Sequence, residues 1–324
     1  MIMTYLYHNQ ISTIMFKKTF IALACMLAGA AALSAQTEKS QIVQGGGSGP
    51  YKAEVVADAS LPDFTVYRPV DLKAAVEKEG KLPVVLYANG ACANDNQQMR
   101  YLLNDVVSHG YLAIAIGPYD EGDVDANWDR VFHPEKYKDQ PRPAGPRKQT
   151  SGNQLLEAMD WLSRQYADPK SDYYHMVALD KVVAMGQSCG GAQALSISYD
   201  PRIKTTIMLN SGMGQVSMGG ASKESIDNLH APILYLNGGP SDIAYKNALQ
   251  DFEKARLREE LAVMISTTDG HHGTYSKEFG GDYAVAVRKW LDWQLKGDEG
   301  QAALFLDPEY IGLRFPTWTL NPEE

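Results

Sequence analysis

One serine in the chain has the surroundings that a nucleophilic serine requires. Gly186, Ser188 and Gly190 form the pattern Gly-x-Ser-x-Gly within "DKVVAMGQSCGGAQALSIS", residues 180–198. A β-branched run precedes the pattern and a run of small residues follows it, which predicts a strand, a sharp turn and a helix. On such a turn the hydroxyl projects above the sheet, where the helix N-terminus favours negative charge. The pattern indicates a nucleophile at Ser188, the alternative being a serine in an ordinary tight turn.

A nucleophilic serine needs a histidine base and an acid that orients it. With this kind of turn, the acid and then the histidine follow the serine along the chain, after later strands. Asp242 follows the strand-like run "PILYLNGG", and His271 and His272 follow the strand-like run "LAVMIST". We expect Asp242 and His271 to complete the set, His271 being preferred because it leaves the strand first. Two alternatives stay open: His272 is the base, or Asp242 only caps the helix near Ile243.

The remaining histidines of the folded part fit a catalytic role less well. His109 ends a helix-like segment, His175 and His230 precede strand-like runs, and His133 lies in a long polar segment. We expect all four to be structural.

Acyl transfer also needs backbone N–H groups that hold the oxyanion. One predicted donor is Cys189, directly after the serine. The other is Ala91 in "ANGACANDN", which follows an earlier strand-like run. An ordinary strand-ending turn is the alternative for that segment.

Strand-like and helix-like segments alternate through the body of the chain, which predicts an α/β protein with a mostly parallel central sheet and helices on both faces. The expected strands cover 62–69, 82–90, 111–117, 180–186, 203–210, 231–239 and 261–267; the expected helices cover 98–110, 150–165, a stretch from about 190, 243–259 and 282–297.

The domain organisation expected from these segments is a single catalytic domain over residues 51–305. A leader occupies 1–35, a flexible glycine-rich linker 36–50 and a C-terminal tail 306–324. The polar, proline-rich stretch 119–150 interrupts the alternation, and loops this long are usually functional or disordered. We expect it to wall a substrate cleft, with a passive surface insertion as the alternative.

The leader has the features of a signal peptide. "MFKKTFIALACMLAGAAALSAQ" starts at Met15, carries two lysines before an apolar run, and offers a small residue before a cut after Ala35. This predicts export to the periplasm or outside the cell, with no stable membrane insertion afterwards. A lipoprotein anchored at Cys25 is disfavoured because the apolar run before it would be very short.

Charge and motif content exclude several classes of function. The formal net charge is -9, and no lysine or arginine stripe is present, which argues against nucleic-acid binding. The chain contains no CxxC, HExxH or P-loop pattern, so we predict no metal, nucleotide or other cofactor.

The quoted motifs together resemble the α/β-hydrolase superfamily, nearest to its dienelactone hydrolase-like, cutinase-like and chlorophyllase-like branches. The resemblance runs from about Pro69 to Lys296 and implies the α/β-hydrolase fold and cofactor-free hydrolysis of carboxylic esters. Polyester-cleaving cutinase-like enzymes carry a tryptophan where this chain has "LNSGMG", which argues against polyester substrates. Dienelactone hydrolases proper use cysteine where this chain has serine. The segments that match are "YANGA", "LNDVVSHGYLAIAIG", "GQSCGG", "GGPSD" and "GHHGTY".

The expected function is therefore that of an exported serine esterase acting on a small-molecule or polymer-linked ester. A peptidase or amidase with the same triad, and a catalytically silent binding domain, are the alternatives. No oligomeric state is predicted.

Two cysteines of the expected mature chain lie at the predicted oxyanion donors: Cys189 is itself one donor, and Cys92 is next to the other. Cys92 follows Ala91, and Cys189 follows Ser188. Because both segments must approach one oxyanion, we predict a Cys92–Cys189 disulfide that joins them; two separate buried thiols are the alternative. Disulfides are typical of exported proteins.

Overall fold

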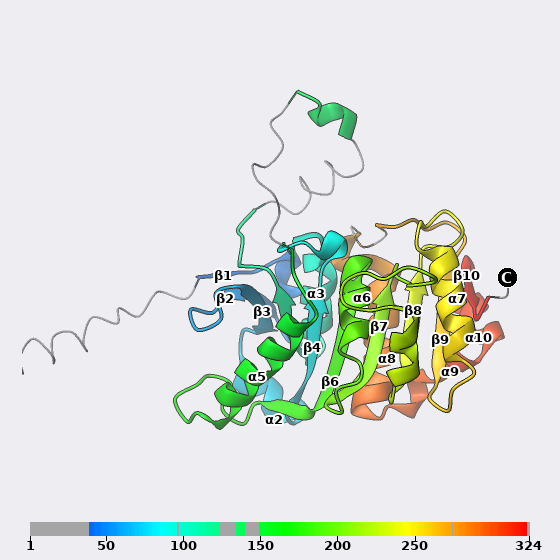
Figure 1. The fold of residues 1–324 in the computed structure, drawn as a ribbon. Coiled ribbons are helices and arrows are strands. Elements are labelled where there is room, and N and C mark those ends of the chain that lie inside the picture. The colour runs from blue at the N-terminus through cyan, green and yellow to red at the C-terminus, as the bar shows by residue number, and fades with distance from the viewer. Residues whose placement is uncertain are drawn as a thin grey trace, which may run out of the picture. The chain divides into compact units, whose positions relative to one another are not determined.

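Ten strands of the described chain form one sheet in the order β1-β2-β3-β5-β4-β6-β7-β8-β9-β10 (Figure 1). The structure is a computed structural model, and it describes residues 39–95, 97–122, 134–139, 149–273, 275 and 277–322. The strands are β1 (Lys39–Gln41), β2 (Ala53–Ala57), β3 (Phe64–Pro69), β4 (Leu82–Ala88), β5 (Leu112–Ile116), β6 (Val177–Gln187), β7 (Ile203–Leu209), β8 (Ile233–Asn237), β9 (Ala262–Thr267) and β10 (Trp318–Leu320).

The six strands from β5 through β9 in the sheet order run parallel to one another, whereas β1, β2, β3 and β10 pair antiparallel at the two edges. Every residue of β4 and β5 is buried. This explains their continuous apolar sequences, because a parallel strand covered on both faces has no solvent side. The predicted α/β class with a mostly parallel sheet is confirmed.

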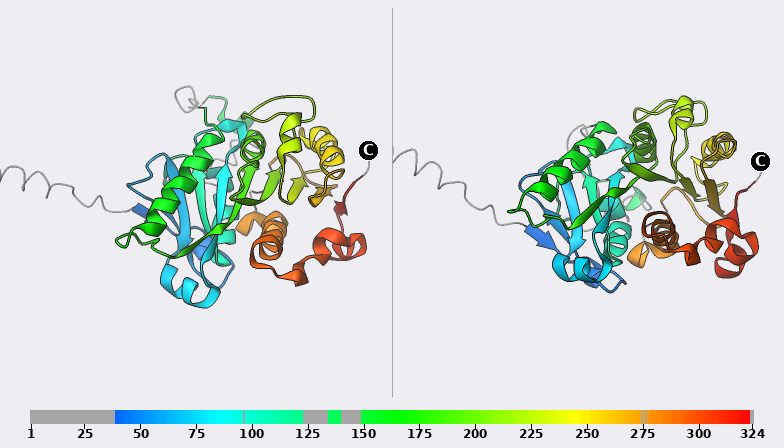
Figure 2. Two further views of the ribbon diagram at one scale, coloured as in Figure 1. Left: turned by 60° about the horizontal axis from the view of Figure 1, so that its bottom comes forward. Right: turned by 90° about the horizontal axis from the view of Figure 1, so that it is seen from below.

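Helices cover both faces of the sheet, as the alternation of segments predicted (Figure 2). The helices are α2 (Leu72–Glu79), α3 (Arg100–Ser108), α5 (Asn153–Ala167), α6 (Cys189–Ser196), α7 (Tyr245–Ala255), α8 (Gly281–Lys296), α9 (Ala303–Leu306) and α10 (Pro308–Arg314). Short 3-10 helices are η1 (Gln44–Gly46), η2 (Gly90–Cys92), η3 (Gln97–Met99), η4 (Pro134–Tyr137), η5 (Lys223–Asn228), η6 (Glu278–Gly280) and η7 (Glu299–Gln301).

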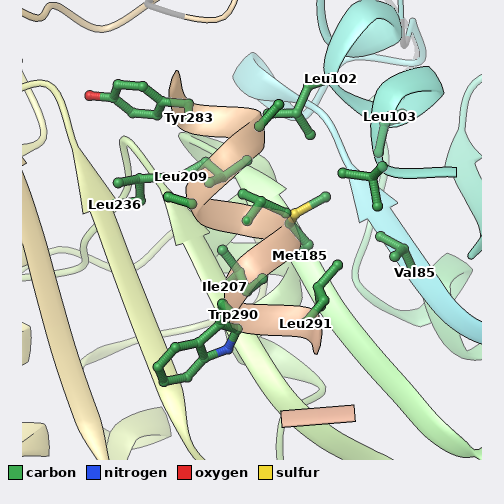
Figure 3. Packing of buried hydrophobic residues seen from close by; sticks show 14 of the residues in the cluster. Val85, Leu102, Leu103, Met185, Ile207, Leu209, Leu236, Tyr283, Trp290 and Leu291 are labelled. Atoms are coloured by element: carbon green, nitrogen blue, oxygen red, sulfur yellow. The ribbon is translucent and has the colours of Figure 1, made fainter. Parts of the chain in front are cut away.

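Side chains that alternate along each strand serve two different cores. In β4, Val85 and Tyr87 pack with residues of α3 and α8, whereas Val84 and Leu86 pack with residues of α5 on the opposite face. Figure 3 shows Trp290 and other side chains of α8 against the strands of the first core. The sheet is thus packed on both faces, and the loops with Ser188, Asp242 and His272 follow the carboxyl ends of its parallel strands.

The predicted ends of the folded domain are corrected by the structure. Residues 39–50, expected within a flexible linker, are ordered, because β1 pairs with β2 and the Val43 carbonyl accepts a 2.9 Å hydrogen bond from Asn104. Residues 306–324, expected as a tail, include α10 and β10, and β10 adds to the sheet beside β9. Three-residue strands leave little sequence pattern, so neither pairing was visible in the sequence.

Two other expectations fall largely outside the described residues. The predicted signal peptide, with Met15, Cys25 and Ala35, lies wholly outside them, as does most of the 119–150 stretch, including His133. Within the part of the chain that is described, no helix has the length and apolarity needed to cross a bilayer.

Candidate active site

Ser188 occupies the sharp turn between β6 and α6 that its sequence pattern predicted. Its φ of 52° and ψ of -122° define a conformation that costs a non-glycine residue energy, and such strained residues cluster at active sites, ligand clamps and switch regions. The flanking glycines are sterically required. A β-carbon at Gly186 would overlap the carbonyl of Gly190, and one at Gly190 would overlap the carbonyl of Ala88. Glycine at 186 therefore lets the end of β6 approach the start of α6, and glycine at 190 lets that turn pack against the end of β4.

His272, and not His271, faces the serine. The Nε2 atom of His272 lies 3.0 Å from Ser188 Oγ, and its Nδ1 atom lies 2.7 Å from Asp242 Oδ1. Because a carboxylate can only accept, Nδ1 carries the proton and Nε2 is free to accept one from the serine. The three side chains thus form a continuous Ser–His–Asp chain at the carboxyl edge of the sheet.

The sequence-based preference for His271 was wrong. The His271 ring lines a small polar cavity of about 110 Å³ with Thr267, Lys277 and Trp318, and its Nδ1 accepts a 3.0 Å hydrogen bond from the Gly273 amide. The two adjacent side chains project in different directions from the loop that follows β9, so only one of them faces Ser188. Order of departure from β9 does not decide which one.

Asp242 is buried and accepts hydrogen bonds on both oxygens. Oδ1 accepts from His272 and from the Ala244 amide at 2.9 Å; Oδ2 accepts from the Gly238 amide at 3.1 Å and from the side chain of Asn210. Burial alone would raise the pKa of Asp242, but the four hydrogen bonds together outweigh it and lower the pKa. The carboxylate is therefore held in its charged form. The alternative role as a cap of the following helix is not borne out, because α7 begins after Ala244, which has no side-chain cap, and in this segment Asp242 accepts only from the amide of Ala244 itself.

Two polar residues that the sequence did not single out complete this arrangement. Asn210, at the end of β7, donates to Asp242 and also to the carbonyl of His271 at 3.0 Å. Tyr275, which is fully buried, donates its hydroxyl proton to Asn210 Oδ1. The sequence signal for Asn210 is the polar residue that follows the apolar run "IML" at the end of β7, in "LNSGMG".

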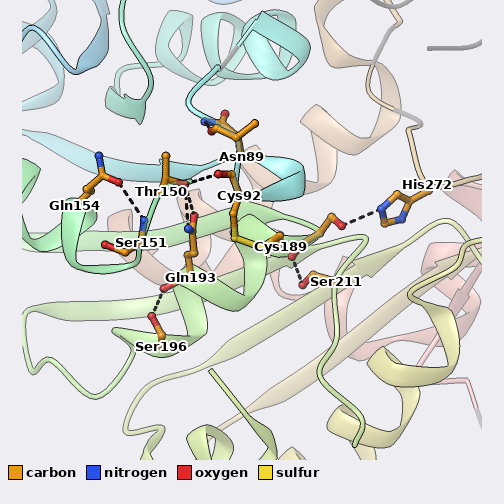
Figure 4. Close-up of a disulfide and its surroundings, with 12 residues drawn as sticks. Asn89, Cys92, Thr150, Ser151, Gln154, Cys189, Gln193, Ser196, Ser211 and His272 are labelled. Carbon is orange, nitrogen blue, oxygen red and sulfur yellow. Dashed lines mark hydrogen bonds between the residues drawn. A yellow bond between two sulfur atoms is a disulfide. The ribbon is translucent and has the colours of Figure 1, made fainter. Parts of the chain in front are cut away.

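The predicted disulfide between Cys92 and Cys189 is confirmed. It joins η2 to the first residue of α6, with the two Cα atoms 5.1 Å apart (Figure 4). Thr150 holds the same segment, because its amide and its hydroxyl both donate to the Cys92 carbonyl at 3.0 Å. The segment that contains Ala91 is thereby fixed beside Ser188.

The disulfide joins the two segments that carry the predicted oxyanion donors, Ala91 in η2 and Cys189 in α6. Cys189 is the first residue of α6, and the N–H groups of a first helical turn have no acceptor within the helix. Ala91 is left-handed, with φ of 55°, within η2. Their catalytic use stays a prediction.

Gln187 connects this side of the site to the histidine, a role that no sequence pattern indicated. Its Nε2 donates to the His272 carbonyl at 3.1 Å. Its Oε1 lies where a β-carbon at Gly90 would be, so a larger residue at position 90 would displace the Gln187 amide. One amide therefore packs against η2 and holds the main chain of the histidine loop.

The other described histidines have structural surroundings. His109 contacts Arg288, His230 contacts the Ile203 carbonyl, and His175 packs against tyrosine rings. Among the described residues, no group of three or more His, Cys, Asp or Glu side chains is placed to hold a metal ion. No protein-family model and no curated protein matches the chain.

Proposed function

We propose that the protein is a serine hydrolase with the α/β-hydrolase fold that cleaves carboxylic esters through an acyl-enzyme. The observation that carries the proposal is the Ser188–His272–Asp242 chain, with contacts of 3.0 Å and 2.7 Å, on a strained turn at a helix N-terminus. Geometry and roles, rather than sequence positions, identify such triads across unrelated folds. The resemblance of the motifs to esterase branches of the superfamily favours esters over amides.

In the proposed reaction Ser188 Oγ attacks the ester carbonyl carbon while His272 Nε2 takes the hydroxyl proton. The carbonyl π pair moves to oxygen, and the amides of Ala91 and Cys189 hold the resulting oxyanion. Asp242 stabilises the positively charged imidazole and keeps the ring in the required tautomer.

The tetrahedral intermediate then collapses and the bond to the leaving oxygen breaks. His272 delivers its proton to that oxygen, so the alcohol leaves neutral and the acyl group stays on Ser188. Water repeats the sequence, with His272 again as the base, and releases the carboxylic acid. No cofactor is needed for either half.

The proposal includes export of the protein, to the periplasm or beyond the cell. Disulfides persist in oxidising compartments and are rare in the cytosol of most organisms, and the Cys92–Cys189 bond agrees with such a location. The substrate is a small-molecule or polymer-linked ester.

Labelling with a fluorophosphonate and turnover of matched chromogenic esters and anilides test the proposal. The wild type should be labelled once and should hydrolyse esters, and Ser188→Ala should do neither while retaining its circular dichroism spectrum. A chain-length series, with feruloyl and acetyl-sugar esters, then defines the acyl and alcohol groups. Absence of labelling and turnover in the wild type would overturn the proposal in favour of a silent binding domain; preferential anilide cleavage would indicate an amidase.

A further inference from the structure

Asn210 lies where the ends of three neighbouring strands meet. It directly follows β7, its amide donates to the Leu236 carbonyl of β8 at 2.8 Å, and its side chain reaches both the acid and the histidine loop. The residue is completely buried. The Asp242 carboxylate accepts hydrogen bonds from the side chains of Asn210 and His272.

The surroundings of the Asn210 amide fix its orientation. On one side are two acceptors, Asp242 Oδ2 and the carbonyl of His271, which require the NH₂ group. On the other side is the hydroxyl of Tyr275, which donates to Oδ1. A flipped amide would place oxygen against two acceptors. Burial raises the pKa of Tyr275 well above its usual range, so the hydroxyl keeps the proton that it donates.

The backbone at position 210 also favours asparagine. Its φ is 43°, in the left-handed region, where glycine is favoured and asparagine is among the few other residues that are tolerated. Asparagine therefore satisfies both the backbone conformation and the side-chain contacts. Replacement by glycine separates these two requirements, because glycine keeps the backbone conformation and removes only the side-chain amide.

We infer that Asn210 is a positioning residue of the triad: its NH₂ group holds the Asp242 carboxylate and the His271 main chain in one arrangement, and Tyr275 acts through it. The inference rests on the proposed function. Because His272 directly follows His271, the Asn210 bond to the His271 carbonyl fixes the point from which the His272 ring projects toward Ser188. Asn210 itself touches no reacting atom.

Removing the amide should change the chemistry in two ways. Asp242 Oδ2 keeps only the Gly238 amide as a donor, and a carboxylate with fewer donors holds a charged imidazole more strongly. The base form needed for attack then appears only at higher pH. In addition, the histidine loop loses an anchor, and small misplacements of a catalytic group are costly.

The test compares Asn210→Gly with Asn321→Gly. Asn321 is a matched control, because it too is left-handed, with φ of 46°, and its side-chain oxygen accepts a 2.9 Å bond from the Met264 amide away from the triad. The concentration of active enzyme is set by fluorophosphonate titration. Asn210→Gly should lower kcat about tenfold to hundredfold and leave KM little changed. Losses of this size are seen when the hydrogen-bond partners of metal-binding residues are removed. The acid limb of kcat/KM should move to higher pH. Asn321→Gly should do neither.

A double-mutant cycle tests the role of Tyr275. Tyr275→Phe frees the amide to rotate and should lower kcat less than Asn210→Gly. The double variant should be no slower than Asn210→Gly alone, because a residue that acts only through Asn210 has nothing further to lose. Additive losses would overturn the assignment of Tyr275.

One readout does not depend on turnover. The low-field proton resonance of the imidazole N–H that faces Asp242 should shift in Asn210→Gly and stay in place in Asn321→Gly. A wild type that hydrolyses no ester would overturn the proposed function but leave this resonance as the measure of positioning. An unshifted resonance, or an Asn210→Gly enzyme with wild-type kcat and pH profile per labelled site, would overturn the inference itself.

Discussion

Cys92 and Cys189 are bonded to each other, and each is the residue that follows a predicted participant in catalysis, Ala91 in one segment and Ser188 in the other. The bond therefore spans the place where the oxyanion would sit. It also closes a loop with a sequence separation of 97 residues. One covalent link is thus expected to matter for both the stability of the fold and the geometry of the site.

Replacing both cysteines by serine should lower the free energy of unfolding. For a loop of this length the chain-entropy model gives a loss on the order of 4 to 5 kcal/mol. The turnover per labelled site should also fall, because the segment of Ala91 loses its covalent link to α6 and keeps only non-covalent contacts, such as those of Thr150 with the carbonyl of residue 92. Urea denaturation and active-site titration measure the two effects.

The reductant control for this prediction uses the same double variant. Tris(carboxyethyl)phosphine should destabilise and slow the wild type but leave the Cys92→Ser/Cys189→Ser protein unchanged. Equal stability of reduced and oxidised wild type would contradict the expectation.

The adjacent histidines provide a matched pair of substitutions. His272→Ala removes the ring between Ser188 and Asp242 and should lower kcat by about 10⁴-fold or more, as loss of a triad histidine does. His271→Ala removes a ring that points into a separate cavity and leaves the carbonyl that Asn210 binds, so kcat should change only slightly. Steady-state kinetics on one chromogenic ester checks both, and a reversed order of the two effects would refute the assignment.

The two histidines show which features of the fold and the site can be predicted from the sequence. Long apolar runs such as β4 and β5 predicted the parallel sheet, because complete burial demands such runs, and Gly186 and Gly190 predicted the turn around Ser188 for steric reasons. The direction in which each side chain of a loop points has no comparable signature in the sequence. Which of two neighbouring rings faces the serine depends on contacts made across the sheet.

Buried polar contacts were equally hidden. Asn210, Gln187 and Tyr275 act through partners 32, 85 and 65 residues away in sequence. Any buried asparagine, glutamine or tyrosine must find a hydrogen-bond partner, so residue type alone does not identify that partner. The disulfide was predictable only because both cysteines lie beside residues already assigned to one site.

Two glycine-to-alanine substitutions should have opposite effects. A β-carbon at Gly190 would overlap the Ala88 carbonyl, which is backbone and cannot move aside, so Gly190→Ala should be severely destabilised or fail to fold. Gly312 in α10 has nothing within 4 Å of the corresponding point, and alanine there should raise the free energy of unfolding by about 0.5 to 1 kcal/mol. Thermal denaturation compares the two. A Gly190→Ala protein of wild-type stability would show that the turn between β6 and α6 leaves room for a β-carbon at position 190.

Asp251 should make the stability of the fold depend on pH. Its carboxylate accepts from the Met213 amide at 2.5 Å and from the Gly214 amide at 2.9 Å, and so holds the loop that follows Asn210. Burial raises the pKa of Asp251 from 3.8 to about 6, although these amides and two nearby lysines, Lys223 and Lys254, oppose the rise.

Because the folded pKa of Asp251 is the higher one, its contribution is full below pH 4 and is lost as the pH rises through 6. The shift from 3.8 to about 6 corresponds to a contribution on the order of 3 kcal/mol. Asp251→Asn keeps one carbonyl acceptor but does not titrate. Urea unfolding from pH 4 to 7 should therefore show the variant gaining stability relative to the wild type across this range. A difference that stays constant with pH would mean that Asp251 is charged in the folded protein throughout.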